Sequence, residues 1–384
     1  MMFDKVISQY DKHSEEILFL IDKFKIDEII FIIDKDKSSK IKRSKEVFKK
    51  IFYNKNVKFE VIEDYSISSL EGILKKNNEA LVNLSGGDRI IALLLLKVSM
   101  ELSMQSIYID FLNKRRYVFK DSCRVINSEM KDTSLKEVFY LSGAEVINES
   151  TELCSEKDVV EISNKILANI ELWHKYKHNL YDNSIFKHNN NDTDNIDIDV
   201  SGLNKNELDL LNNSIKYLVD NNSIDIRKES NLIHTRFKKS YLKSVIFKSG
   251  TWLEVITYLA VKNIKEVDEV RSGVLFSWGL NAEIVKNEID VIAIKDSVLI
   301  CISCKDSNKY DDDALNELSV YSERLGGKNV LKILVATKQP QKVSVVQRAK
   351  EMNIHLVILE NASINYLQNS LRVIINEKIR NVVL

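Results

Sequence analysis

The sequence predicts an α/β protein with an N-terminal Rossmann-like sheet, a small helical or winged-helix-like connector and a second α/β unit at the C-terminus. Three observations predict this fold class. The chain has 384 residues, a length that corresponds to two or three domains. Apolar runs rich in isoleucine alternate with helical patterns over residues 1–125. The same alternation, which is typical of a mostly parallel sheet, returns over residues 249–384.

The N-terminal unit is expected to span residues 1–130. Its clearest strand is residues 27–34, where a nearly continuous apolar run indicates a strand covered on both faces. A basic, helix-like stretch of net charge +6 follows at residues 35–50. We expect further strands at residues 57–64, 79–84, 106–113 and 115–120, with helices at residues 67–77 and 89–103.

The connector is expected to span residues 131–248. Helical patterns cover residues 157–176 and 206–221. Between them, residues 188–199 are rich in Asn and Asp, and we interpret them as an exposed loop.

The end of the connector is basic, because residues 226–248 carry seven basic residues and one acidic residue. Phe237, Tyr241 and Phe247 lie among these charges. The pattern fits a nucleic-acid contact in which an aromatic ring stacks on a base. It fits equally well a solvated amphipathic segment with buried aromatics.

The C-terminal unit, residues 249–384, repeats the α/β pattern with its own apolar core. It is expected to begin with a helix at residues 251–263. Strands are predicted at residues 273–278, 288–294, 298–304, 332–337 and 355–360, with helices at residues 314–327 and 344–353.

The composition excludes several classes of protein. One proline and ten glycines exclude collagen-like and low-complexity chains. The 56 basic residues balance the 56 acidic residues, so no global field indicates a polyanion partner. Four cysteines are too few for a disulfide scaffold, and we expect a cytoplasmic protein. No run of 18 apolar residues exists, so no membrane span is expected.

The cysteines and histidines form no convincing metal site. Cys301 and Cys304 have CxxC spacing, but positions three apart on a strand face opposite sides, so we expect core cysteines. His174 and His178 are flanked by lysines and are expected on a solvated helix face. The three tryptophans, Trp173, Trp252 and Trp278, are expected in cores or interfaces.

A glycine-containing turn follows the strand at residues 79–84. Glycines let backbone amides approach a ligand, and the start of the next helix adds positive potential, which suits a phosphate or ribose-phosphate. The ligand-binding candidates in this turn are Asn83, Ser85, Gly86, Gly87, Asp88 and Arg89.

A second ligand-binding candidate follows the strand at residues 27–34 and comprises Asp34, Lys35 and Ser38. In open parallel sheets, ligands bind beyond the carboxyl ends of strands. Neither segment has the GxxxxGK[ST] pattern of a P-loop, so the sequence does not support ATP hydrolysis there. The residues alone also allow a plain strand-to-helix turn capped by a serine.

The turn N-L-S-G-G-D-R, residues 83–89, resembles the N-x-[ST]-G-G-[TS]-[KR] turn of CARF domains, the Rossmann-like sensors of CRISPR-associated proteins. The resemblance implies a homodimer that binds a cyclic oligoadenylate in a shared pocket, with cyclic tetra-adenylate as the expected activator. Asp88 departs from the usual Thr or Ser, which removes a hydroxyl and places a carboxylate near a polyanion.

Carboxylates and a lysine lie on neighbouring predicted strands of the C-terminal unit. Strand alternation places Glu288 and Asp290 on one face, and Ser303 and Lys305 on one face of the next strand. Glu254 lies on the preceding helix. Carboxylates bind Mg²⁺ or Mn²⁺, and a lysine can stabilise the transition state of phosphodiester hydrolysis. Each charge alone also fits a solvent-facing strand end.

This set resembles the PD-(D/E)xK nuclease core over roughly residues 249–360. The segments G-T-W-L-E, N-E-I-D-V and S-C-K look like the nuclease half of CARF-nuclease effectors of type III CRISPR systems. The residue at the usual acidic [DE]-x-K position is Ser303, which is a weaker ligand for a hard cation. The resemblance implies catalytic roles for Glu254, Asp290, Ser303 and Lys305, metal binding by Glu254, Glu288 and Asp290, and support from Glu317 and Tyr321.

The sequence thus predicts a homodimeric nuclease that a cyclic oligoadenylate activates and that cleaves DNA, RNA or both with Mn²⁺ or Mg²⁺. Two alternatives stay open. The first is a ligand-gated regulator that binds nucleic acid while Ser303 leaves the nuclease domain inactive. The second is a ring nuclease that degrades the cyclic nucleotide in the CARF pocket.

Overall fold

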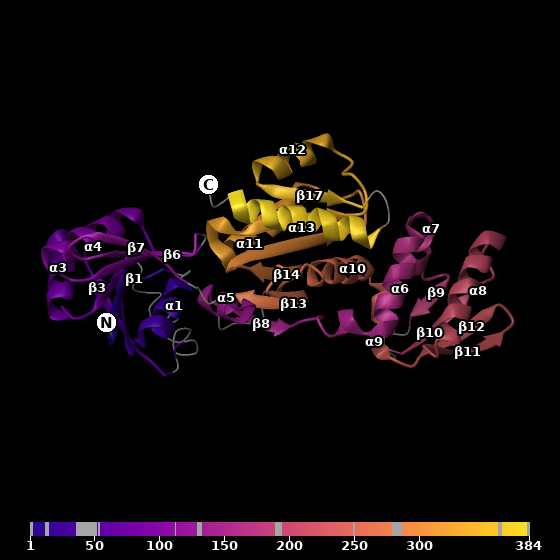
Figure 1. Cartoon of the computed structure of the whole chain (residues 1–384). Coiled ribbons are helices and arrows are strands. Elements are labelled where there is room, and N and C mark those ends of the chain that lie inside the picture. Colours follow the sequence, from indigo (N-terminus) through magenta and orange to yellow (C-terminus); the bar gives the residue numbers. More distant parts are fainter. Residues whose placement is uncertain are drawn as a thin grey trace.

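The protein is described by a computed structural model that covers residues 3–11, 15–35, 52, 54–111, 113–128, 133–188, 194–248, 250–278, 286–359 and 363–381. These residues form three sheets of seven, four and six strands, surrounded by helices. Figure 1 shows the six-stranded sheet in the middle, with the seven-stranded sheet at one end and the four-stranded sheet at the other. The predicted mixed α/β fold class is confirmed.

The seven-stranded sheet is the Rossmann-like unit. Its first five strands are parallel and the last two are antiparallel, in the order β3-β2-β1-β4-β5-β6-β7. The order reverses between β1 and β4, the position where such sheets bind ligands. Its strands are β1 (Lys5–Gln9), β2 (Glu28–Asp34), β3 (Asn56–Ile62), β4 (Leu81–Asn83), β5 (Ser106–Asp110), β6 (Arg115–Phe119) and β7 (Cys123–Asn127).

Helices cover both faces of this sheet. The helix α1 (Glu15–Phe24) packs on one face, where its Ile17 and Leu20 are buried. The helices α3 (Ile67–Lys76) and α4 (Arg89–Glu101) pack on the other, around Ile7 and Val82. The basic stretch at residues 35–50 falls outside the described residues, apart from its first residue.

The central strand β1 was not predicted from the sequence. Its second half carries Ser8 and Gln9, which are polar and yet 0% and 3% exposed. Burial of such residues requires hydrogen-bond partners that come from distant segments, so no local pattern indicates this strand.

The four-stranded sheet belongs to the connector and is antiparallel, in the order β11-β12-β10-β9. Helices α6 and α7 lead into it, and α8 crosses it. Its elements are η2 (Leu153–Ser155), α6 (Lys157–Ala168), α7 (Ile170–Tyr176), η3 (Lys177–Tyr181), β9 (Phe186–His188), β10 (Asn195–Asp199), α8 (Lys205–Asp220), β11 (Ile224–Glu229), β12 (Leu232–Phe237) and α9 (Ser240–Phe247).

The loop predicted at residues 188–199 is wrong for His188, which ends β9, and for residues 195–199, which form β10; residues 189–193 lie outside the described residues. Ile196 and Ile198 alternate with polar residues and are buried against the connector core. On the other face, Asp197 and Asp199 bond to His234 and Lys187. Alternation of period two is a strand signal that the Asn- and Asp-rich composition obscured.

The basic stretch at the end of the connector is mostly paired within the protein. Lys238 lies 3.1 Å from Asp225, and Lys239 lies 2.8 Å from Asp158. Phe237 is 4% exposed and packs on Phe247. Phe237 is therefore a core residue, and the buried-aromatic interpretation is the correct one for it.

The six-stranded sheet carries apolar cores on both faces, with the order β17-β16-β15-β14-β13-β8. Helices α10 and α13 cover one face, and α5, α11 and α12 cover the other. Its elements are α5 (Leu135–Leu141), β8 (Ala144–Asn148), α10 (Thr251–Lys262), β13 (Glu269–Trp278), β14 (Lys286–Lys295), β15 (Val298–Lys305), α11 (Asp312–Gly326), η4 (Gly327–Asn329), β16 (Leu331–Ala336), α12 (Val343–Glu351), β17 (Ile354–Ile358) and α13 (Ile364–Asn381).

Strand β8 of this sheet and the helix α5 that covers it come from the segment expected to be connector. β8 pairs antiparallel with β13, so it forms the edge strand of the six-stranded sheet. The helix α5 places Leu135 and Phe139 in the same core.

Cys301 and Cys304 are buried on opposite faces of β15, which confirms that they are core cysteines. In the part of the chain that the structure describes, no helix is both long and apolar enough to cross a membrane.

Candidate functional sites

The best-defined polar site of the six-stranded sheet lies where β14 and β15 run side by side. Val291 pairs with Ile302 in the antiparallel ladder, so the preceding Asp290 faces Ser303. One carboxylate oxygen of Asp290 accepts hydrogen bonds from the Cys304 backbone N–H at 2.6 Å and from the Ser303 hydroxyl at 3.2 Å. The hydroxyl at the position of the usual acid therefore orients the neighbouring aspartate.

Glu254 and Asp290 form a pair of half-buried, interacting carboxylates. Burial raises the pKa of Glu254 to about 8, and the charge of Asp290 adds to this effect, while Lys248 and Lys305 oppose it. Burial also raises the pKa of Asp290, although the Cys304 amide and Lys305 stabilise its charged form. Two acids that resist ionisation together are typical of a site that is completed by a cation.

Lys248 also belongs to this site, although it was not predicted as a site residue. Its ammonium lies 3.4 Å from a carboxylate oxygen of Glu288. Burial opposes its charge, but Glu254 and Glu288 together raise its pKa. The only signal in the sequence was its position at the end of the basic stretch. Glu288, 42% exposed in its side chain, pairs with this lysine, and its charge also contributes to the raised pKa of Glu254 and Asp290.

The donor set fits a divalent cation held by two carboxylates. Within the described residues, no group of three or more His, Cys, Asp and Glu side chains is placed to hold a metal ion. Mg²⁺ keeps several waters and needs only one or two protein carboxylates. Glu254 and Asp290 match that requirement, because neutralising both would remove their mutual repulsion.

Glu317 and Tyr321 contact each other on α11, as their four-residue spacing predicts. Burial and the Glu317 carboxylate raise the pKa of Tyr321, whose ring packs edge-to-face on Phe276. The contacts described for them are with each other and with the core beneath.

The glycine turn after β4 lies at the switch point of the seven-stranded sheet, as predicted. Asn83 bonds to the turn through its carbonyl, which accepts from the Ser85 amide at 3.1 Å. The Ser85 hydroxyl accepts from the Ile109 amide on β5 at 2.7 Å. Asp88 caps α4 by accepting from the Ile90 amide at 2.8 Å, while Arg89 is exposed.

Two side chains hold the amides of this turn, Gln9 at the end of β1 and Asp11 just after it, and neither was predicted from the sequence. The Gly87 amide donates to Asp11 at 3.1 Å, and the Asp88 amide donates to Gln9 at 2.7 Å. Gly87 has a φ of 84°, and a β-carbon there would lie 2.1 Å from the Gln9 side-chain oxygen. The turn therefore requires glycine at position 87.

The segment after β2 lies beside this turn but is less tied to it. Lys35 pairs with Glu63 at 2.7 Å on an exposed surface. Asp34 interacts electrostatically with Tyr65, whose hydroxyl accepts from Gln9 at 3.4 Å. Ser38 lies outside the described residues.

Glu16 is buried beneath the glycine turn. Its carboxylate accepts from the Asn83 side-chain amide at 3.2 Å, and a β-carbon at Gly86 would lie 2.4 Å from it. Burial, with smaller contributions from Glu15 and Asp11, raises the pKa of Glu16 to about 8.

This raised pKa predicts a pH-dependent stability. Glu16 binds its proton more tightly in the folded than in the unfolded chain, so its contribution is full below about pH 4.5 and is lost as the pH rises to about 8. The free energy of unfolding should therefore fall by about 1.4 kcal/mol per pH unit in this window, relative to Glu16→Gln. Urea denaturation at pH 6, 7 and 8 measures the difference. The control is Glu71→Gln on α3, whose side chain is 40% exposed and which should keep the wild-type slope. An unchanged slope in Glu16→Gln would contradict the assignment.

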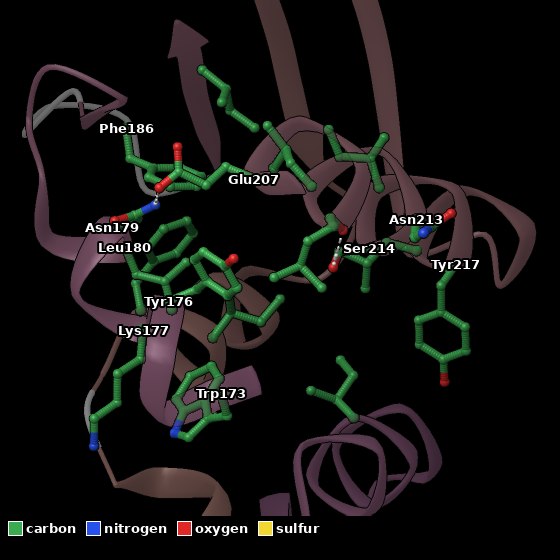
Figure 2. Close-up of a pocket in the computed structure, with 18 of the residues that line it drawn as sticks. Trp173, Tyr176, Lys177, Asn179, Leu180, Phe186, Glu207, Asn213, Ser214 and Tyr217 are labelled. Atoms are coloured by element: carbon green, nitrogen blue, oxygen red, sulfur yellow. Dashed lines mark hydrogen bonds between the residues drawn. The ribbon is translucent and has the colours of Figure 1, made fainter. Parts of the chain in front are cut away.

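A cavity of about 530 Å³ lies in the connector. Figure 2 shows Tyr176, Leu180 and Phe186 on one side of it and residues of α8, including Ser214 and Tyr217, on the other. Its lining is mostly aliphatic and aromatic, with an Asn179–Glu207 hydrogen bond at its edge.

Comparison with protein families gives one domain. Residues 242–378 match the model of the Card1-like endonuclease domain. The matched segment contains α10, β14 and β15, and hence Glu254, Asp290, Ser303 and Lys305. The C-terminal part of the chain is therefore similar to the Card1-like endonuclease domain. No curated protein matches the sequence.

Solved structures match the chain along almost its whole length. Protein VC1899 from Vibrio cholerae superposes with a TM-score of 0.73 and 18% identity, covering 96% of this chain and 97% of that chain. Can2 from Sulfobacillus thermosulfidooxidans, solved with cyclic tetra-adenylate, gives a TM-score of 0.66 at 15% identity, with 98% of both chains covered. A type III CRISPR defence DNA nuclease activated by cyclic oligoadenylate gives 0.54 at 12%, covering 94% of this chain but 49% of that one. The fold expected from the resemblance to CARF-nuclease effectors is confirmed.

Proposed function

We propose that the protein is a metal-dependent endonuclease of type III CRISPR defence that a cyclic oligoadenylate activates. The observation that carries this proposal is the Glu254–Asp290 carboxylate pair beside Lys305, inside a Card1-like endonuclease domain. The organisation into a CARF sensor (residues 1–130), a connector and a nuclease unit (residues 249–384) is part of the proposal.

In this site, Glu254 and Asp290 would hold Mg²⁺ or Mn²⁺, which as a bound Lewis acid polarises the phosphate and lowers the pKa of a water. Ser303 and the Cys304 amide fix Asp290 in the orientation that it needs. Lys305 donates hydrogen bonds to the phosphate oxygens as negative charge builds up on them. Lys248 holds Glu288 and adds positive charge at the edge where a polyanionic strand enters. The substrate is DNA, RNA or both.

The activator is proposed to be cyclic tetra-adenylate, bound at the carboxyl ends of β1, β2 and β4. Can2, which has this fold, was solved with that ligand. The start of α4 and the glycine turn supply backbone dipoles that favour phosphate groups.

A homodimer through the seven-stranded sheet is supported by an exposed apolar stripe on α4. Ile90, Leu93 and Met100 are 58%, 60% and 52% exposed, respectively, and lie on the same side of the helix. A stripe of this kind is costly on an isolated surface and suits a two-fold contact between identical faces.

Omission experiments test the proposal. Purified protein is incubated with plasmid DNA, single-stranded DNA and RNA, with and without Mn²⁺ and cyclic tetra-adenylate. We expect cleavage only when both are present, because the carboxylate pair needs the cation and the sensor needs its ligand. EDTA should stop the reaction, and an excess of Mn²⁺ should restore it.

The other outcomes identify the alternatives. Binding of nucleic acid without cleavage in any mixture would contradict the proposal and favour a ligand-gated regulator. Mass spectrometry of the cyclic nucleotide after incubation would reveal ring-nuclease activity, because the products would be shortened or linear oligoadenylates.

A further inference from the structure

The residue after Lys305 is Asp306, and its buried carboxylate accepts more hydrogen bonds than a surface carboxylate needs. The Asp306 side chain is 1% exposed. Its carboxylate receives N–H or O–H groups from Trp173 at 2.7 Å, Trp252 at 3.0 Å, His174 at 3.0 Å, Lys177 at 3.1 Å and Thr337 at 3.1 Å.

This arrangement corrects the prediction for His174, which is 9% exposed and points into the protein rather than to solvent. Burial alone would raise the pKa of Asp306. The bonds from His174 and the two tryptophans, together with Lys177, lower it instead to about 2. Asp306 is therefore charged at neutral pH and its charge is paired by these donors, so removal of one donor leaves a buried charge short of a partner.

The partners of Asp306 come from four elements. Thr337 follows β16, and its amide also donates to the Lys305 carbonyl at 3.1 Å, so it holds both residues at the end of β15. Trp252 lies in the first turn of α10, two residues before Glu254. Asp306 thus connects the strand end that carries Lys305 to the helix that carries Glu254.

The remaining partners belong to the connector. Trp173 lies on α7 and packs edge-to-face on Trp252, and Lys177 begins η3 and also bonds to the Asp306 carbonyl. Both side chains line the connector cavity, and Figure 2 shows their nitrogens directed away from its apolar centre.

We propose that Asp306 is a positioning residue that sets the geometry of Lys305 relative to Glu254 and makes it depend on the connector helix α7. This inference rests on the proposed nuclease function. It adds that the connector is a structural part of the active site, through the donors of Trp173 and Lys177.

Trp173→Phe is the sharpest test, because it removes one N–H bond to Asp306 and keeps most of the ring. Asp306→Asn is the stronger variant, but it places an amide among donors and endangers folding. The matched control is Trp278→Phe on β13, where Arg324 lies over the ring at 3.9 Å and Phe276 packs edge-to-face on it. Thermal melting verifies that each variant is folded.

Two measurements are made on the full chain. Cleavage kinetics should show a kcat about tenfold lower in Trp173→Phe at an unchanged KM, since displaced catalytic groups slow chemistry without weakening binding. Lysines labelled by ¹³C-methylation report the environment of Lys305 by NMR, with the resonance assigned from Lys305→Arg. That resonance should shift in Trp173→Phe and stay in place in Trp278→Phe.

An unshifted Lys305 resonance in folded Trp173→Phe would overturn the inference, whatever the kinetics show. A shift of equal size in Trp278→Phe would do the same, because the effect would not be specific to Asp306. The NMR measurement does not need turnover. If the wild type cleaves nothing, the proposed function fails while the resonance still decides the role of Asp306.

Discussion

Lys305→Ala is expected to lower the cleavage rate by about 10²- to 10³-fold, the usual cost of removing one group that stabilises charge in the transition state. Lys305 closes an apolar strand beside Asp290 and Glu254, and its charge opposes the rise in the pKa of Glu254. Initial rates on a labelled substrate, with saturating Mn²⁺ and cyclic tetra-adenylate, measure the loss. The effect should fall on kcat, because sensor and substrate surfaces are unchanged.

Lys309→Ala is the matched control for this variant. Lys309 lies four residues further on, is exposed and leaves the carboxylate pair untouched, so its rate should stay within about twofold of the wild type. Binding of cyclic tetra-adenylate, measured by calorimetry, should be the same in both variants. Retention of wild-type turnover by Lys305→Ala would remove the lysine from the mechanism.

Gly87→Ala is expected to weaken binding of cyclic tetra-adenylate by at least about 100-fold. The new β-carbon would lie 2.1 Å from the Gln9 side-chain oxygen, at a φ of 84° that L-residues rarely adopt. Either Gln9 releases the Asp88 amide or the turn changes shape, and both alter the start of α4. Calorimetric titration gives the affinity, and ligand-stimulated cleavage should decline in parallel.

Gly72→Ala is the control for the glycine turn. Gly72 lies on α3 of the same unit, and a β-carbon there meets nothing within 4 Å. Alanine also favours a helix, so this variant should bind normally and melt no earlier than the wild type. If Gly87→Ala binds as tightly as Gly72→Ala, the ligand does not use the glycine turn.

The strands that the sequence predicted most clearly are those whose apolar runs are long, although the more polar β3 and β6 were also predicted. β2 and β14–β17 are buried on both faces, and near-continuous apolar sequence indicates such strands. The strands that were missed are short and carry polar residues; they are β1, β7, β8 and the connector strands β9 to β12. The pairing of β8, for example, depends on β13, about 130 residues further along the chain, and no local window contains that information.

The residues of the candidate sites divide in the same way, into those that local sequence patterns predicted and those that they did not. Strand alternation was enough to bring Asp290 together with Ser303, because adjacent strands share a register. Lys248, Gln9, Asp11 and Asp306 were not selected, because their roles come from contacts between distant segments. A single Asp after a strand looks like an ordinary surface residue until the tryptophans that enclose it are known.

The edge strand β8 has a consequence for synthesis of the chain. It leaves the ribosome about 120 residues before β13, the strand with which it pairs. At roughly 5–20 residues per second, α5 and β8 wait about 6–24 s for a partner. During that time the apolar residues Leu135 and Phe139 have no sheet to cover. Fragments of the nuclease unit that begin at residue 249 lack both elements, so we expect them to expose the side of β13 and to aggregate.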